Sequence, residues 1–231
     1  MEKRLTASNA GAALGLCSFV NRQQAFNRAM GVERMLNKEL SDAIGCTRVT
    51  QGHPLYTFYR VMGKAGSDAP RWGMKHESDG VHAYTIHTGH AVQKAGLLVH
   101  PTCSWLAGSP DGLVGTKGLL EVKCPFRFKR DGTRVHETIS AAHYIQMHLC
   151  LQISGREWCD FVSWTPEAHA IYRVTRDPDL HEAMMLHYER FYAAMRTAQV
   201  GPPALSRHEQ HDIEERVKQS MAAHVIVNYT V

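Results

Sequence analysis

Two acidic residues and a lysine stand close together in a stretch whose pattern is typical of a β-hairpin. Asp111 follows a proline-containing turn, and Glu121 and Lys123 lie in the apolar run 119–123, which Pro125 ends. Alternate residues of a strand share one face, so Glu121 and Lys123 point to the same side. The hairpin turn can bring Asp111 beside that polar face, where two carboxylates and one ammonium would meet.

This combination of side chains could bind a divalent cation. Two neighbouring carboxylates repel each other unless a cation lies between them. Their hard oxygen atoms suit Mg²⁺ or Mn²⁺, and Mg²⁺ commonly takes only one or two protein carboxylates, leaving its other positions to water and phosphate. A lysine beside such a site could hold a water molecule and offset phosphate charge. An ordinary surface hairpin is the open alternative, because the Asp…Glu-x-Lys pattern is short and its residue types are common.

Length and composition limit the protein class. A chain of 231 residues is long enough for one large domain, and a hydrophobic content of 44% is typical of a soluble globular protein. No apolar run reaches membrane-spanning length. The formal net charge of +4 is compatible with nucleic-acid binding without requiring it. The six cysteines form no Cys-x-x-Cys pair, which argues against a zinc ribbon and favours free thiols in a reducing compartment.

Hydrophobic periodicity and breaker residues predict the elements that would position the charged groups. Residues 6–45 are expected to be mainly helical, followed by a loop-like stretch at 62–71 and a helix that starts near Trp72 and carries Glu77 in its first turn. Further expected elements are a strand at 93–100, a helix at 140–154 ended by Gly155, strands at 158–164 and 170–174, and a helix at 177–195 whose inward side chains are Leu180, Met184, Leu186 or His187, and Phe191.

This order of elements predicts a mixed α/β (α+β) fold with a central mixed β-sheet flanked by helices. Residues 1–197 would form a single domain, with N-terminal helices at 6–45 and a core at about 72–195. Residues 198–231 are expected to be a polar C-terminal tail that could hold one helix.

Three polar residues near these elements have an ordinary structural explanation. Ser8 would cap the first helix, although a helix N-terminus also suits a phosphate. Glu77 would interact favourably with the dipole at the start of its helix, and Gln146 would be a tolerated polar residue on its helix. The basic segment that starts at Arg127 begins just beyond Lys123, so it would lie near the mouth of the site, where phosphates could use it.

Four stretches, in the right order, resemble the phage lambda exonuclease / YqaJ-like viral recombinase family of restriction-endonuclease-like nucleases. They are residues 4–8 with Thr-Ala-Ser, Trp72-Gly73 with Glu77, Ser109-Pro110-Asp111 with Glu121-Val122-Lys123-Cys124-Pro125, and residues 144–148 followed by 155–162. The resemblance covers about residues 4–195, and the ordered set is far more specific than any one stretch.

The resemblance implies a Mg²⁺-dependent 5′→3′ exonuclease, with Mn²⁺ able to substitute. Such an enzyme degrades double-stranded DNA from its ends and leaves 3′ single strands for recombination beside a single-strand annealing protein. The resemblance further implies a closed homotrimeric ring, threaded by the duplex, as in many members of the family. The implied location is intracellular and without a membrane: the cytoplasm of the host cell for a phage protein, or the nucleus for a eukaryotic or eukaryotic-virus protein.

The resemblance also implies a role for each matching residue. Asp111 and Glu121 would be metal ligands, with the Val122 carbonyl as a third and Glu77 as an accessory ligand or the holder of a metal-bound water. Lys123 and Gln146 would position the attacking water. The terminal 5′-phosphate would be bound by Ser8, Ser109 and Lys129, with Arg127 close by.

Three positions depart from the family pattern. The place of the family's phosphate-binding arginine, a few residues before Thr-Ala-Ser, falls at or beyond Met1, so either Arg4 would substitute for it or the chain starts late. The second glutamine of the Gln helix is His148, and the arginine after the core strand is Lys129, which cannot grip a phosphate bidentately. These departures bear on 5′-phosphate selectivity and processivity more than on hydrolysis.

Two other functions are compatible with the same core. One is a structure-specific or sequence-specific DNA endonuclease, since a fold does not fix an activity. The other is a catalytically silent DNA-binding module, against which the intact set of Asp111, Glu121 and Lys123 argues.

Overall fold

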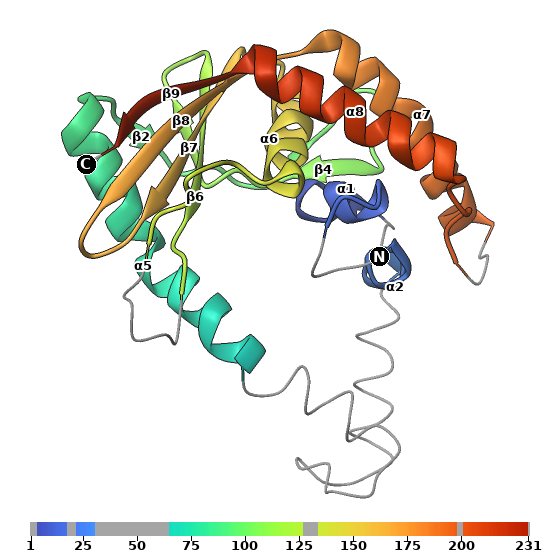
Figure 1. Ribbon diagram of the computed structural model, residues 1–231, viewed down its shortest axis with the longest axis horizontal. Coiled ribbons are helices and arrows are strands. Elements are labelled where there is room, and N and C mark those ends of the chain that lie inside the picture. The colour runs from blue at the N-terminus through green and yellow to red at the C-terminus, as the bar shows by residue number, and fades with distance from the viewer. Residues whose placement is uncertain (1–3, 18–21, 31–64, 127–133, 198–200, 231) are drawn as a thin grey trace, which may run out of the picture.

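The hairpin that carries Asp111 and Glu121 lies in the larger of two β-sheets (Figure 1). The computed structural model describes residues 4–17, 22–30, 65–126, 134–197 and 201–230. Its strands are β1 (Leu5–Thr6), β2 (Val92–Gln93), β3 (Leu98–Val99), β4 (Leu106–Gly108), β5 (Gly112–Val114), β6 (Gly118–Lys123), β7 (Trp158–Trp164), β8 (His169–Thr175) and β9 (Val225–Thr230). Its helices are α1 (Ala7–Ala13), α2 (Arg22–Met30), α5 (Ala65–Thr88), α6 (Ala141–Ser154), α7 (Pro178–Arg196) and α8 (Arg207–His224).

Strand β6 lies inside the larger sheet, whose strand order is β2-β5-β6-β7-β8-β9. It pairs antiparallel with β5, so that Gly112 lies opposite Leu120, and parallel with β7, so that Glu121 lies beside Phe161. The other pairs of this sheet are antiparallel. The smaller sheet, β1-β4-β3, combines a parallel and an antiparallel pair. The fold class predicted from the sequence, a mixed α/β fold with a central mixed sheet flanked by helices, is confirmed.

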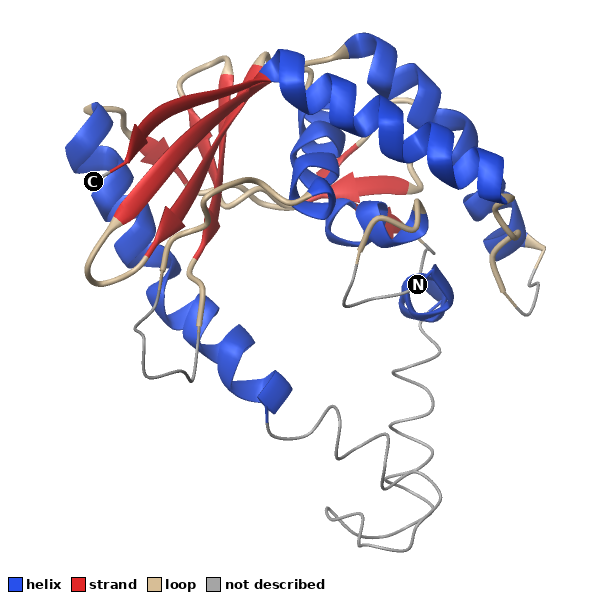
Figure 2. Ribbon diagram, viewed as in Figure 1, coloured by secondary structure: helices blue, strands red, loops and turns tan. Residues whose placement is uncertain are grey.

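Helices cover both faces of the larger sheet (Figures 1 and 2). Helix α5 lies on one face, where Tyr84 packs with Leu120 and Val122 in a small apolar cluster. Helix α6 lies on the other face with α1, α7 and α8 around it, and Leu119 belongs to this larger core. Side chains of β6 therefore alternate between two buried layers, and Glu121 points toward the layer of α6.

Helix α5 is longer than the sequence predicted. It begins at Ala65, inside the stretch 62–71 that was expected to be a loop, and ends at Thr88. The predicted loop is wrong for residues 65–71, which belong to the helix although Pro70 lies beyond its first turn, where a proline ordinarily weakens a helix. Glu77 consequently lies in the middle of α5 and not in a first turn, so the helix dipole does not explain it.

Close packing holds the middle of α5 against the sheet. A Cβ atom on Gly80 would lie 2.5 Å from Cγ1 of Val122, so any larger residue would force the helix away from β6. The rings of Trp72 and His76 pack at a centroid distance of 4.0 Å, and His76 stacks 5.5 Å from Trp164 at the end of β7. These contacts fix the turn of α5 that lies next to the end of β6.

The central helix and the following hairpin agree with the sequence prediction. Ser140 caps α6 by accepting a hydrogen bond from the His143 backbone N–H, and Gly155 ends the helix at a φ of +68°. Strands β7 and β8 form the predicted antiparallel pair. The single strand predicted at 93–100 is wrong, because the chain crosses between sheets there: β2 pairs with β5, whereas β3 pairs with β4.

Helix α7 follows its prediction in length but not in every inward side chain. Leu180, Met184 and Phe191 are buried as predicted. Leu186 is 59% exposed and His187 is only half-buried, so neither is the buried residue that lies between Met184 and Phe191. Tyr188 is buried there, because it lies one turn beyond Met184 on the same side of the helix.

The last part of the chain packs on the sheet. Helix α8 begins with a capping box between Ser206 and Glu209, and β9 pairs antiparallel with β8 at the sheet edge. The sequence allowed for one helix here and did not predict the strand. Among the helices of the described residues, none is long and apolar enough to cross a membrane.

Candidate active site

Asp111 and Glu121 meet where β5 begins and β6 nears its end. The backbone N–H of Asp111 donates to the Leu120 carbonyl at 3.0 Å, and Oδ2 of Asp111 accepts from the Val122 backbone N–H at 2.7 Å. Because Gly112 pairs with Leu120, the next step of the ladder sets Asp111 opposite Glu121. The hairpin therefore brings together the two carboxylates that the sequence placed on one polar face.

Glu121 is the buried centre of the site, with 1% of its surface exposed. Its Oε1 accepts hydrogen bonds from the Lys123 ammonium and, at 2.6 Å, from the side-chain amide of Gln146. Lys123 comes from the same face of β6, and Gln146 comes from α6, which covers that face. Gln146 is therefore more than a tolerated polar residue of its helix, since it contacts the central carboxylate directly.

Glu77 approaches from the opposite layer, on α5. It lines the same pocket as Asp111 and Lys123. Burial and then the negative charge of Asp111 raise the pKa of Glu77, whereas Lys123 and Lys94 act to lower it. A third carboxylate thus faces the pair formed by Asp111 and Glu121.

The electrostatics of the site are not balanced by Lys123. Burial, together with the charges of Asp111 and Glu77, raises the pKa of Glu121 to about 7 against the opposing charge of Lys123. Burial also raises the pKa of Asp111, against Lys123 and the Val122 N–H, which act to lower it. Burial would lower the pKa of Lys123, but the three acids outweigh it and raise that pKa. Among the described residues, the three acids Glu77, Asp111 and Glu121 outnumber the ammonium groups of Lys123 and Lys94, which leaves an excess of negative charge.

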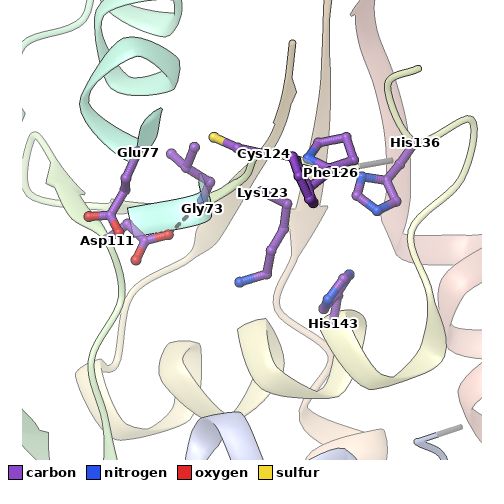
Figure 3. A pocket seen from close by; sticks show the side chains of 10 residues that line it. Gly73, Glu77, Asp111, Lys123, Cys124, Phe126, His136 and His143 are labelled. Atoms are coloured by element: carbon purple, nitrogen blue, oxygen red, sulfur yellow. Dashed lines mark hydrogen bonds between the residues drawn. The ribbon is translucent and has the colours of Figure 1, made fainter. Parts of the chain in front are cut away.

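The carboxylates stand between two hollows of the surface. One is a pocket of about 360 Å³ lined by Glu77, Asp111, Lys123, His136 and His143 among others. Figure 3 shows Glu77 and Asp111 on one side of this pocket, Lys123 reaching into its middle, and the two histidines on the far side. The second hollow, of about 520 Å³, shares Glu77 and Asp111 and includes Lys94 and Ser109.

Three of the pocket-lining residues were missed by the sequence prediction. His143 lies three residues before Gln146, so the helical spacing that unites their faces was a usable signal. His136 comes from an irregular stretch before α6, and Lys94 from the connection after β2. Neither of these two has a pattern that would have pointed to the site.

Ser8 and Ser109 lie at the same end of two neighbouring strands of the smaller sheet. Strands β1 and β4 are parallel, and each serine follows the end of one of them. The expectation that Ser8 caps α1 is wrong: Thr6 occupies the N-cap position, and the hydroxyl of Ser8 lies 3.2 Å from that of Thr6. Ser109 lines the second hollow, and its hydroxyl donates to the Gly96 carbonyl at 3.4 Å.

Of the three basic residues expected at the phosphate end, Arg4 is the one that lies within the described residues. Arg4 donates a hydrogen bond from Nε to the Ser104 carbonyl at 3.0 Å, and it does not line either of the two hollows. Arg127 and Lys129 lie outside the described residues.

A comparison with protein-family models assigns the chain to a family. The model of the YqaJ-like viral recombinase domain matches residues 2–157, which is more than half of the 231 residues. The chain belongs to this family. Asp111, Glu121, Lys123 and Gln146 all lie within the matched YqaJ-like region. A comparison with curated proteins gives no match.

Solved structures share the fold of this YqaJ-like protein. The chain is similar to an alkaline exonuclease (LHK-Exo) from Laribacter hongkongensis, with a TM-score of 0.58, 22% identity, and 94% of each chain covered. A structure of LHK-Exo in complex with dAMP gives a TM-score of 0.59 at 22% identity, covering 94% of this chain and 95% of that one. The predicted nuclease fold is therefore confirmed, at an identity that shows the fold alone.

The donor set of the YqaJ-like site fits a divalent cation that prefers oxygen. Asp111 is partly buried and Glu121 is buried, and Lys123 does not cancel the repulsion between them, which is the environment that such a cation relieves. Within the described residues, no group of three or more His, Cys, Asp or Glu side chains forms a cluster that could hold a metal. The fit therefore rests on the carboxylates of Asp111 and Glu121, with the carboxylate of Glu77 at the same pocket.

Proposed function

We propose that this YqaJ-like protein is a Mg²⁺-dependent exonuclease that degrades double-stranded DNA from its 5′ ends and leaves 3′ single strands. The observation that carries the proposal is the pairing of partly buried Asp111 with buried Glu121, with Lys123 and Gln146 both hydrogen-bonded to Glu121. Buried negative charge in excess does not stabilise a fold, whereas it suits a cation and the phosphodiester that the cation binds. Mn²⁺ has the same ligand preference and is expected to substitute.

Each of the gathered residues then has a task. Asp111, Glu121 and the Val122 carbonyl would hold the ion, and Glu77 would hold a water beside it. When bound, the ion would lower the pKa of a water molecule and offset phosphate charge. Lys123 would donate a hydrogen bond to the attacking water, favour its deprotonated form and stabilise the anionic transition state.

Gln146 has a supporting task. Its amide keeps the Glu121 carboxylate oriented and would present a second contact to the attacking water. As the water oxygen bonds to phosphorus, the P–O3′ bond of the strand breaks and the 3′ oxygen takes up a proton. The product is a nucleotide with a 5′-phosphate.

Family membership and the size of the pocket favour action at ends. LHK-Exo, which has the same fold, is known in complex with dAMP, a single deoxynucleotide. A pocket of about 360 Å³ likewise suits one nucleotide better than a duplex. The hydroxyls of Ser8 and Ser109, at one end of the smaller sheet, would contact the terminal phosphate. The 3′ strands that remain are the substrate of an annealing protein.

Digestion of linear duplex labelled at the 5′ or the 3′ terminus tests the proposal. With Mg²⁺, the 5′ label should leave first as a mononucleotide, and EDTA should stop the reaction. Lys123→Ala and Asp111→Ala should lower the rate at least about 100-fold with unchanged thermal unfolding. Lys117→Ala, a change of an exposed lysine paired with Glu157, is the matched control and should digest normally.

Three outcomes contradict the proposal. Cutting of linear DNA with blocked ends would make the protein an endonuclease. No digestion by the wild type with Mg²⁺ or Mn²⁺ would make it a DNA-binding module. Digestion by Lys123→Ala at the wild-type rate would show that this site does not take part in hydrolysis.

A further inference from the structure

His143 lines the pocket on the side opposite the carboxylates. It lies on α6 three residues before Gln146, so both side chains extend from one side of that helix. Figure 3 shows its ring beyond Lys123 as seen from Asp111. The ring packs against His136 at a centroid distance of 5.9 Å and against Phe161 at 5.6 Å. Packing between two rings thus fixes the position of the imidazole at the pocket wall.

One hydrogen-bonding nitrogen of this ring is not used by the part of the fold that the structure describes. Nδ1 of His143 is buried and has no hydrogen-bond partner in the described part of the chain. A buried polar atom without a partner is unusual in a native protein and calls for an explanation such as a bound group. Other buried histidine nitrogens of the described residues, including both of His148, also lack a partner, so what singles out His143 is that its ring lines the pocket beside Lys123.

The charge state of the ring is also defined. Burial lowers the pKa of His143 to about 3, and the positive charges of Lys123 and His136 act in the same direction. The imidazole is therefore neutral at any pH at which a nuclease would be assayed, and it carries one N–H donor and one acceptor nitrogen. It adds no charge that would compete with Lys123 for Glu121.

The surroundings favour an anionic oxygen as the partner of that donor. Of the described residues that line the pocket, Lys123 is the only lysine or arginine, and its ammonium is already hydrogen-bonded to Glu121. His143 also belongs to the first turn of α6, where the helix dipole favours negative charge. A strand bound with its scissile phosphate at the carboxylates would extend past Lys123 toward this ring.

We propose that His143 is a substrate-positioning residue whose neutral imidazole donates a hydrogen bond to a non-bridging oxygen of a DNA phosphate next to the scissile one. The proposal rests on the nuclease function proposed above. It assigns the ring no part in proton transfer, because the hydrogen bond serves to hold the strand against Asp111 and Glu121.

Two substitutions at this position separate positioning from packing. His143→Phe keeps a ring of similar shape and removes the donor, and His143→Gln restores a donor without a ring. We expect His143→Phe to lower kcat/KM about tenfold, which is the loss of one hydrogen bond to a charged group, and His143→Gln to stay within about threefold of the wild type. His82→Phe, the same change at an exposed position of α5, is the control and should leave both constants unchanged.

Chemically altered DNA identifies the contacted oxygen. Linear duplexes with a neutral methylphosphonate at one of the phosphates that flank the first scissile bond are compared for wild type and His143→Phe. The tenfold difference between the two proteins should disappear at one position and persist at the others. The affinity for duplex ends, measured by fluorescence anisotropy in EDTA, should fall in His143→Phe as well, and this readout needs no hydrolysis.

Several results would overturn the inference. Equal kcat/KM and equal affinity of His143→Phe and wild type would show that the ring makes no contact with DNA. Loss of an ionisation from the pH–rate profile in His143→Phe, without rescue by His143→Gln, would make the ring an acid or base. Equal losses in both variants with lowered melting temperatures would reduce it to packing. A wild type that digests no DNA contradicts the nuclease proposal instead, and the anisotropy comparison still decides for His143.

Discussion

Two acidic residues on neighbouring strands, Glu121 on β6 and Asp160 on β7, are each only 1% exposed but have opposite surroundings. In the parallel register, Asp160 lies beside Leu120 and therefore on the α5 side of the sheet. Its two oxygens accept hydrogen bonds from Arg173, each at 2.8 Å, and Oδ2 also accepts from the Tyr84 hydroxyl at 2.8 Å. This cluster is balanced in charge.

Glu121 faces the opposite layer, where acids outnumber the lysine. Lys123 and Gln146 both donate to the same oxygen of Glu121, and burial with the neighbouring acids raises its pKa to about 7. The difference teaches that burial of an acid is by itself no sign of function. What distinguishes the site is that its buried charge is unbalanced and next to a pocket.

The largest expected effect in stability concerns Glu121. The Glu121 carboxyl has a pKa of about 7 in the folded protein and an ordinary value of 4.5. In EDTA it therefore binds a proton more tightly in the folded chain than in the unfolded chain. The free energy of unfolding should therefore fall as the pH rises from 4.5 through 7, by up to about 3 kcal/mol from this group. Glu121→Gln should lack that part of the fall, measured by urea unfolding from pH 4.5 to 8. Parallel curves for both proteins would contradict the imbalance.

A smaller effect is expected on the balanced side. Asp160→Asn removes the charge that pairs with Arg173, whose side chain is 30% exposed and can partly rehydrate. The free energy of unfolding should drop by about 2 kcal/mol, with the nuclease rate of the folded protein unchanged. Urea unfolding and digestion rates measured on the same sample check both parts. A loss of activity in the folded variant would mean that the two clusters are coupled.

The smallest effect links the site to its cation. Mg²⁺ at a concentration of ten times its dissociation constant should raise the free energy of unfolding of the wild type by about 1.4 kcal/mol, because the ion binds only the folded chain. Asp111→Asn should not respond, whereas Asp160→Asn should respond as the wild type does. Thermal unfolding in EDTA and in Mg²⁺ measures this difference. An equal response of Asp111→Asn would place the bound ion elsewhere.

The sequence alone was sufficient where a local repeat or a breaker residue decides the structure. The period of two along β6 set Glu121 and Lys123 on one face, and Ser140 and Gly155 marked the ends of α6. The hairpin register that brings Asp111 to Glu121 follows from the short turn between β5 and β6. These features depend on residues close together in the chain, so their physics is readable from the order of amino acids.

Features that depend on burial and on contacts between distant parts of the chain were decided by the tertiary structure alone. It set Gln146 on the carboxylate of Glu121, because α6 packs across the face of β6, and it set Glu77 at the pocket in the middle of a helix that starts earlier than expected. It also brought His143 to the pocket wall and turned the last residues into a strand at the sheet edge. The sequence thus determined which charges the hairpin presents. Their imbalance depends on how much water and countercharge the packed layers leave around them, and no local pattern encodes that.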